Sequence, residues 1–156
     1  MVTLPHPRAE ARPLSSRLAL GFGVLFLVIG ILGFIPGITT NYGAMTFAGH
    51  HSGALLLGVF QVSILHNLVH LAFGAAGIAM ARDADTARLF LVGGGAIYLL
   101  LWLYGLVINR ASPANFIPLN TPDNWLHFLL GVAMVALGVY VTRGARVDRT
   151  DRADRR

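Results

Sequence analysis

Six side chains that can donate protons, accept protons or bind a metal fall in two apolar stretches of the chain. They are His66, Asn67, His70, Asp123, Asn124 and His127. The second stretch begins 57 residues after the first, which aligns His70 with His127. Three imidazoles, one carboxylate and two amides inside apolar segments are unusual, so this polar cluster is the candidate site.

The residue types in the cluster fit four kinds of chemistry. Neutral histidine, asparagine and aspartate side chains can form an interhelical hydrogen-bond network, worth about 0.6–2 kcal/mol per contact in a membrane. The set His66, His70, Asp123 and His127 is also a possible ligand set for zinc or another divalent metal. A b-type haem held between His70 and His127 is a third possibility. A proton or small-solute pathway is the fourth, because intramembrane ionisable groups often mark such pathways.

The composition predicts that a membrane surrounds the cluster. The chain has 156 residues, of which 55% are hydrophobic and 12% are charged, whereas a soluble domain carries about 25% charged residues. Four long apolar segments leave no room for a soluble domain. Cysteine is absent, which excludes disulfides and thiolate chemistry, and all twelve basic residues are arginine, which favours a bacterial source with a GC-rich genome.

The apolar segments predict an all-α fold, an integral membrane four-helix bundle with helices near residues 17–36, 53–81, 87–109 and 122–142. Residues 1–16 and 143–156 are expected to be disordered cytoplasmic tails, the second one basic. The segment 53–81 is longer than one crossing needs, so residues 54–62 either continue a tilted helix or form a separate interfacial piece. The last helix is expected to start with Thr121 as N-cap and Pro122 as its first residue.

The arginines predict the orientation of the bundle. Eleven of the twelve lie in the two tails, at Arg17 directly after the first tail, or in the short turn around residues 82–88, and only Arg110 lies in a loop on the other side. Loops rich in arginine stay in the cytoplasm. We therefore expect a multi-pass plasma-membrane protein with both termini in the cytoplasm and the polar cluster in the outer half of the bundle.

The two polar stretches each lie on the second helix of a helical pair, which indicates two parallel two-helix repeats. Steps of three and four residues put Asn67, His70 and Gly74 on one helix face, and Asn124, His127 and Gly131 on another. We expect these two faces to pack against each other, because small residues permit close approach and polar groups then find partners.

Four motifs resemble a bacterial four-pass membrane family that is catalogued as domain of unknown function four-three-eight-three. They span residues 33–37, 65–70, 114–120 and 123–127, and the resemblance covers about residues 18–142. Ser63 departs from the pattern, which has asparagine there. The resemblance implies a four-helix membrane fold and brings no activity with it.

The functional expectation is a small, non-catalytic integral membrane protein with a structural, partner-binding or sensory role. No nucleophile–base pair or dinucleotide fingerprint is found in the sequence, and the triplet Gly93, Gly94 and Gly95 lacks the flanking residues of a phosphate loop. The arginine-rich tail reads as a topology signal, so no nucleic-acid partner is expected. The lipid bilayer is the expected partner, and a protein partner or a homo-oligomer stays open.

Overall fold

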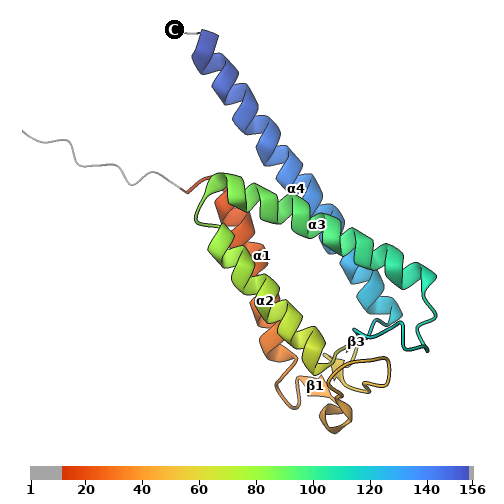
Figure 1. Cartoon of the computed structure of the whole chain (residues 1–156). Helices are drawn as coiled ribbons and strands as arrows, with labels where there is room; N and C mark the ends of the chain where they lie inside the picture. The colour runs from red at the N-terminus through yellow and green to blue at the C-terminus, as the bar shows by residue number, and fades with distance from the viewer. Residues whose placement is uncertain (1–11, 155–156) are drawn as a thin grey trace, which may run out of the picture.

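The computed structural model of the protein describes residues 12–154, with side chains described as far as residue 142. The helices are α1 Leu14–Leu32, α2 Ile64–Met80, α3 Ala84–Val107 and α4 Thr121–Asp154 (Figure 1). Three of them contain stretches long and apolar enough to cross a membrane, namely α1, α3 and the part Thr121–Thr142 of α4, and α2 is a shorter apolar helix. The predicted all-α membrane four-helix bundle is confirmed.

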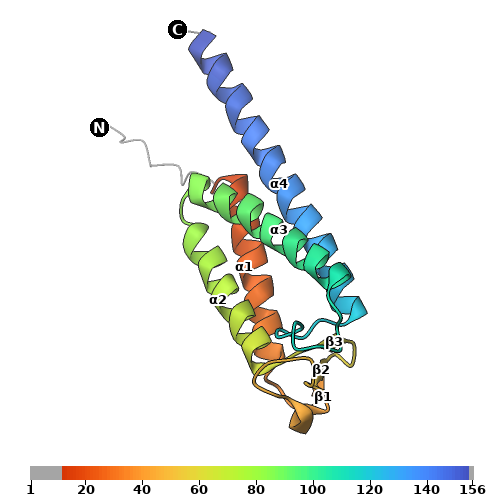
Figure 2. The same cartoon turned by 45° about the vertical axis from the view of Figure 1, so that its right-hand side comes forward.

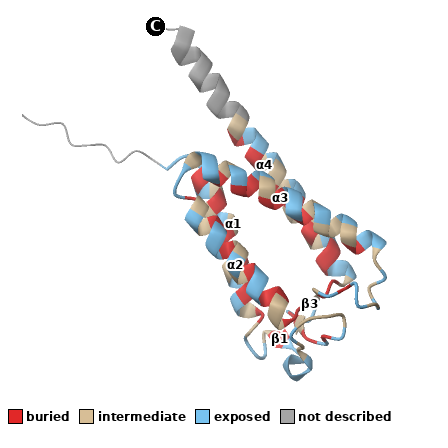
Figure 3. Ribbon diagram, in the orientation of Figure 1, coloured by how far each residue is buried: buried red, intermediate tan, exposed pale blue. Residues whose placement is uncertain are grey.

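Large apolar side chains cover the outside of the bundle. Leu100, Val107 and Leu129 expose 65%, 81% and 62% of their surface, and buried residues lie mainly on the helix faces turned toward other helices (Figure 3). Soluble monomers rarely expose so much apolar surface. This distribution fits helices that contact lipid.

The helices pack as two antiparallel pairs, α1 with α2 and α3 with α4 (Figures 1 and 2). Glycines bring the backbones of each pair together. A Cβ atom added to Gly23 would lie 2.9 Å from the carbonyl oxygen of Gly74, and one added to Gly95 would lie 2.9 Å from that of Gly131. Both pairs therefore depend on the same kind of close contact between small residues.

The two pairs meet mainly through α1 and α3. Phe26 of α1 stacks on Tyr98 of α3, with ring centroids 5.2 Å apart, inside the buried core. Our expectation that the faces of α2 and α4 pack on each other is wrong for the asparagines and glycines. Asn67 packs against Gly33 and Asn124 against Gly105, each within its own pair, because a side-chain amide fits where the facing residue has no side chain.

The segment between α1 and α2 forms a small sheet. Its strands are β1 Thr39–Thr40, β2 Leu55–Leu56 and β3 Phe60–Gln61, antiparallel in the order β1-β2-β3, and a short 3-10 turn, η1, covers Tyr42–Ala44 (Figure 2). Leu57 and Gly58 adopt the left-handed φ values of 55° and 72° that reverse the chain.

The predicted helix over 53–81 is therefore corrected: α2 starts only at Ile64. The question left open for residues 54–62 is answered by the hairpin of β2 and β3, which is separate from α2. The physical reason is that the Leu57–Gly58 reversal and the N-cap at Ser63 both interrupt a helix that the apolar residue types alone would permit.

The ends of the bundle also differ from the expectation. Helix α1 begins at Leu14, so residues 14–16 belong to the helix, and α4 continues to Asp154 instead of ending near Thr142. Figure 1 shows this last part of α4 running beyond the other helices. The rest of the two predicted tails, residues 1–11 and 155–156, lies outside the described residues.

Candidate functional site

The polar cluster is built on the N-terminal turns of α2 and α4. Ser63 caps α2 by accepting a hydrogen bond at Oγ from the His66 backbone N–H at 3.1 Å. Asn120 caps α4 by accepting at Oδ1 from the Asp123 N–H at 2.9 Å, and the Asp123 carboxylate accepts from the Asn120 N–H at 3.0 Å. The N-cap of α4 is thus Asn120, one residue before the Thr121 that we expected.

Gln61 of strand β3 connects the two helix starts. Its backbone N–H donates to Asp123 Oδ2 at 3.0 Å, and its carbonyl oxygen accepts from His66 Nδ1 at 3.0 Å. Its side-chain amide donates to the carbonyl oxygens of Ser52 and His50. The sheet therefore fixes the position of both helix starts and of the polar side chains that they carry.

The hydrogen bonds set the chemistry of the two histidines of α2. His66 Nδ1 faces the Gln61 carbonyl and His70 Nδ1 faces the His66 carbonyl, each at 3.0 Å. A carbonyl oxygen only accepts, so each Nδ1 carries the hydrogen, and in a neutral imidazole Nε2 is then an acceptor. Tyr98 Oη lies 3.4 Å from His70 Nε2 and can donate to it.

Tyr98 is the residue of the site that our sequence reasoning missed. It also contacts His127 edge to face, with ring centroids 5.1 Å apart. The available signal was a tyrosine in the middle of an apolar helix, because a buried phenol hydroxyl usually finds a hydrogen-bond partner. Tyr98 therefore links the histidines of α2 to the histidine of α4.

Two cavities meet at the histidines. The first, of about 80 Å³, lies between α2 and α3 and is lined by His66, His70 and His127 together with Phe73, Tyr98 and Leu101. The second, of about 100 Å³, lies between α1 and α4 and shares the same three histidines, with Asp123, Leu126 and Leu130. Apolar side chains form most of the remaining walls of both cavities.

Exposed apolar residues border both cavities. Val69, Ile97 and Phe116 border the first cavity and are 43%, 49% and 54% exposed, and Leu57 borders the second and is 62% exposed. Val69 and Ile97 belong to the apolar outer surface of α2 and α3, whereas Phe116 and Leu57 lie in the loops at that end of the bundle. Part of the apolar outer surface of α2 and α3 therefore borders the first cavity.

The structure brings together four of the six predicted residues. His66, His70, Asp123 and His127 are buried and line the second cavity together. Asn67 and Asn124 are buried elsewhere, in the contacts with Gly33 and Gly105. His50 and His51 stack on each other in the loop after α1, with ring centroids 3.9 Å apart, and they line neither cavity.

The arrangement does not fit the metal site considered for His66, His70, Asp123 and His127. Among the described residues, three or more such side chains do not gather closely enough to hold a metal ion. Backbone carbonyl oxygens bind Nδ1 of His66 and of His70, and backbone N–H groups bind Oδ2 of Asp123. These hydrogen bonds leave Nε2 of both histidines open, so it is the separation of the side chains, and not their hydrogen bonding, that speaks against the metal site.

A haem between His70 and His127 does not fit either. The Tyr98 hydroxyl lies 3.4 Å from His70 Nε2, the atom that would bind the iron. The cavities of about 80 and 100 Å³ are also far smaller than a porphyrin. The geometry instead offers buried hydrogen-bonding atoms at the inner end of two small apolar cavities.

The comparisons with known proteins leave the activity open. A family model described as "Domain of unknown function (DUF4383)" matches residues 16–140, which include both cavities and nearly all of the apolar parts of the four helices. No curated protein and no solved structure matches the chain.

Proposed function

We propose a function from geometry, because the chain belongs to the family described as Domain of unknown function (DUF4383), whose description assigns no activity. The proposed function is non-catalytic binding of a small neutral amphiphile that enters from the bilayer. Its hydrogen-bonding group would lie against the histidines and its apolar body along the outer surface of the bundle. The observation that carries this proposal is the position of His66, His70 and His127 at the inner end of both apolar cavities.

An unsatisfied polar atom supports a ligand with a hydrogen-bonding group. His127 Nδ1 is buried and has no hydrogen-bond partner among the described residues. A buried polar atom without a partner costs about 1–3 kcal/mol. A ligand hydroxyl can donate to this atom or accept from it, so binding would remove that cost.

The charges around the cavities favour a neutral ligand. The cavity walls contain no arginine, and their one carboxylate, Asp123, already accepts hydrogen bonds from two backbone N–H groups. A ligand charge placed there would lose its hydration without gaining an opposite charge. Neutral alcohols, phenols and ketones therefore suit the site better than fatty acids or amines.

The size of the cavities sets how much of the ligand enters. A cavity of about 150 Å³ holds a benzene molecule, and the two cavities here measure about 80 and 100 Å³. Only a terminal group would fit, with the rest of the molecule outside. The exposed side chains of Val69 and Ile97 would contact that apolar remainder.

We infer that the two cavities are equivalent because the helix pairs are copies of one unit. Residue numbers rise by 72 from α1 to the matching position of α3, and by 57 from α2 to that of α4. With these offsets, the contact of Gly23 with Gly74 corresponds to the contact of Gly95 with Gly131. The same offsets relate Asn67 on Gly33 to Asn124 on Gly105. They also relate walls of the two cavities, Ile29 to Leu101 and Val69 to Leu126.

The orientation that goes with this function places both termini and the α2–α3 turn in the cytoplasm. Arg12, Arg82 and Arg88 lie at that end of the bundle, and the sheet and the histidines lie at the other. The arginine distribution supports this orientation in the plasma membrane. The histidine cavities would then be accessible from the outer leaflet.

Photolabelling tests the proposal on purified full-length protein. The probe is a long-chain alcohol with a photoreactive diazirine next to its hydroxyl group, and the matched fatty acid and alkane probes serve as chemical controls. We expect the alcohol to label the protein in a saturable way that unlabelled alcohol suppresses. Equal, non-saturable labelling by all three probes would show that no such site exists.

Two variants sharpen this test. His127→Phe keeps an aromatic ring beside Tyr98 but removes the unpartnered nitrogen, and we expect about tenfold weaker labelling, the loss that follows from about 1.4 kcal/mol. His51→Phe changes a histidine outside the cavities and should label as the wild type does. Unchanged saturation in His127→Phe would contradict a role of the histidines in binding.

A further inference from the structure

A separate cavity lies at the opposite end of the bundle from the histidines. It measures about 290 Å³ and is formed where α1 begins and α2 ends. The residues that line it include Arg12, Pro13, Ser16, Leu20, Ile78 and Arg82. It differs from the histidine cavities in that two arginines and one serine line it together with apolar residues.

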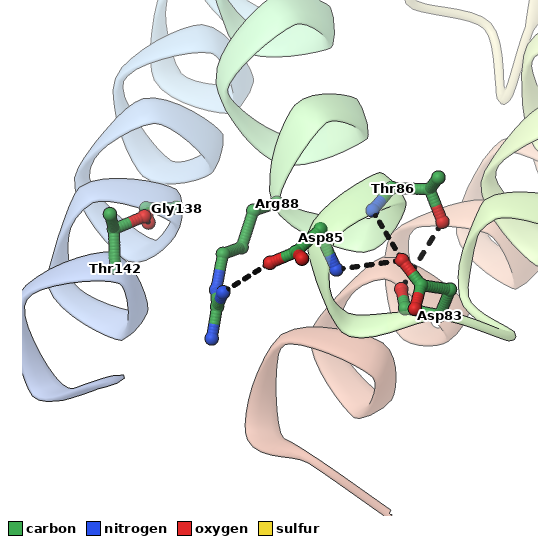
Figure 4. Close-up of polar contacts among 6 residues, drawn as sticks. All are labelled: Asp83, Asp85, Thr86, Arg88, Gly138 and Thr142. Carbon is green, nitrogen blue, oxygen red and sulfur yellow. Dashed lines mark hydrogen bonds and ion pairs between the residues drawn. The ribbon is translucent and has the colours of Figure 1, made fainter. Parts of the chain in front are cut away.

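The two arginines of this cavity have no acidic partner among the described residues. The one ion pair among the described residues joins an Nη atom of Arg88 to Oδ1 of Asp85, at 2.6 Å (Figure 4). Asp83 is next to Arg82 in the chain, but its carboxylate accepts from the N–H groups of Asp85 and Thr86 at the start of α3. Neither aspartate of the neighbouring turn therefore forms an ion pair with Arg12 or Arg82.

Two positive charges facing one cavity call for an anion, and the shape of the guanidinium group selects its class. A guanidinium binds phosphate through two parallel hydrogen bonds, and phosphate can accept from two arginines at once. Ser16, which is only 3% exposed, supplies a hydroxyl group in the first turn of α1. The positive end of the α1 dipole points the same way and adds to the attraction.

The depth of the cavity fits the headgroup region of a bilayer. Leu20 and Ile78 continue the cavity wall into the apolar part of α1 and α2, while the two arginines lie at the ends of these helices. Basic pockets between transmembrane helices at the cytoplasmic side bind anionic lipid headgroups. An acyl chain could lie along the apolar floor while the phosphate meets the arginines.

We propose that the cavity of Arg12, Ser16 and Arg82 binds a phosphate group, as carried by the headgroup of an anionic phospholipid. The site belongs to the first helix pair alone. At the corresponding place in the second pair, Ala84 stands for Arg12 and Val139 for Arg82. Arg88 of the second pair therefore serves as an internal control, because it lies at the same end of the bundle but forms an ion pair with Asp85.

Native mass spectrometry of the full-length protein released from detergent micelles tests this proposal. Phosphatidylglycerol and phosphatidylcholine are added in turn, with inorganic phosphate as a competitor. We expect bound phosphatidylglycerol in preference to phosphatidylcholine, and about tenfold weaker binding in Arg82→Gln and in Arg12→Gln, since each variant loses a charge-assisted hydrogen bond. Arg88→Gln should bind as the wild type does.

The outcomes separate the possible sources of the phosphate. Displacement of the lipid by millimolar inorganic phosphate would identify a site for the phosphate group itself, whereas resistance would show that the acyl chains contribute. Either result supports the site if it depends on Arg82. Equal lipid binding by wild type and Arg82→Gln, or an equal loss in Arg88→Gln, would overturn it. Arg12→Gln changes a residue before the first helix, so it tests the site even if Arg82→Gln misfolds.

Discussion

Gly93 and Gly95 lie two residues apart in α3 but have different surroundings. A Cβ atom on Gly95 would lie 2.9 Å from the Gly131 carbonyl oxygen and 2.9 Å from the Val135 backbone nitrogen. A Cβ atom on Gly93 would meet only a Leu89 methyl group, at 3.9 Å. The same residue type therefore holds two helices together at one position and merely occupies a helix surface at the other.

This difference gives the first prediction. Gly95→Ala should lower the free energy of unfolding by about 1–3 kcal/mol, because backbone atoms of α4 would have to move. Gly93→Ala should be neutral or stabilise by up to about 1 kcal/mol, since alanine favours a helix. Denaturant titration in mixed micelles measures both. Equal destabilisation by the two substitutions would contradict the proposed packing of α3 on α4.

At the scale of elements, the starts of α2 and α4 position the site. Asn120 and Asp123 exchange hydrogen bonds through their side chains and backbone N–H groups. Asn120 also donates through its side chain to the Val59 carbonyl oxygen at 2.7 Å, so it connects α4 to the hairpin. The hairpin and the start of α4 therefore hold each other in place.

The second prediction compares two neighbouring residues of this start. Asn120→Ala should destabilise the protein by about 0.5–2 kcal/mol, the usual cost of a lost N-cap. Thr121→Ala should cost much less, because the Thr121 hydroxyl only accepts an exposed hydrogen bond from Arg110. Thermal unfolding followed by circular dichroism should show the larger loss of stability in Asn120→Ala. A larger loss in Thr121→Ala would indicate that Thr121 is the N-cap.

The third prediction concerns the start of α3 and its dependence on pH. Hydrogen bonds from the N–H groups of Thr86 and Asp85 lower the pKa of Asp83 below its ordinary value of 3.8. The carboxylate therefore stabilises the fold above that value, and this stability is lost as the pH falls through the lowered pKa. The gap in melting temperature between wild type and Asp83→Asn should narrow below about pH 4. A gap that does not change with pH would contradict this role of Asp83.

Sequence reasoning found the helices because long apolar runs have few alternatives in a membrane, and it found the histidines because polar residues are conspicuous there. It could not find the hairpin, since Leu55, Leu56 and Phe60 are as apolar as helix residues and only Leu57–Gly58 reverses the chain. The residue spacing placed Asn67 on the same helix face as His70, but it could not show that the Asn67 amide packs against Gly33. Such pairings depend on which helices are neighbours in space.

At the scale of the whole molecule, two helix pairs meet at Phe26 and Tyr98, and Tyr98 also lines the first histidine cavity. The pairs are joined by the short α2–α3 turn at one end and by β3 with its link to Asp123 at the other. The proposed lateral entry from lipid relies on Val69 and Ile97, which are exposed and border the first cavity.

The fourth prediction tests the orientation of this assembly. The chain lacks cysteine, so single cysteines report position without background. Phe47→Cys, at a residue that is 64% exposed near the sheet, should react with an impermeant thiol reagent added outside intact cells. Asp85→Cys, in the first turn of α3, should react only after the cells are opened. Labelling of both from the same side would rule out the proposed orientation.

The most direct test of the account is to map where the photoreactive alcohol attaches, by mass spectrometry of the cross-linked peptides. If the hydroxyl group lies against the histidines, the adjacent diazirine should attach to Phe73, Tyr98 or Leu101, which line the first cavity. Attachment there should disappear with excess unlabelled alcohol. Attachment spread over outward residues such as Val24 and Leu129, unaffected by competitor, would contradict a binding site at the histidines.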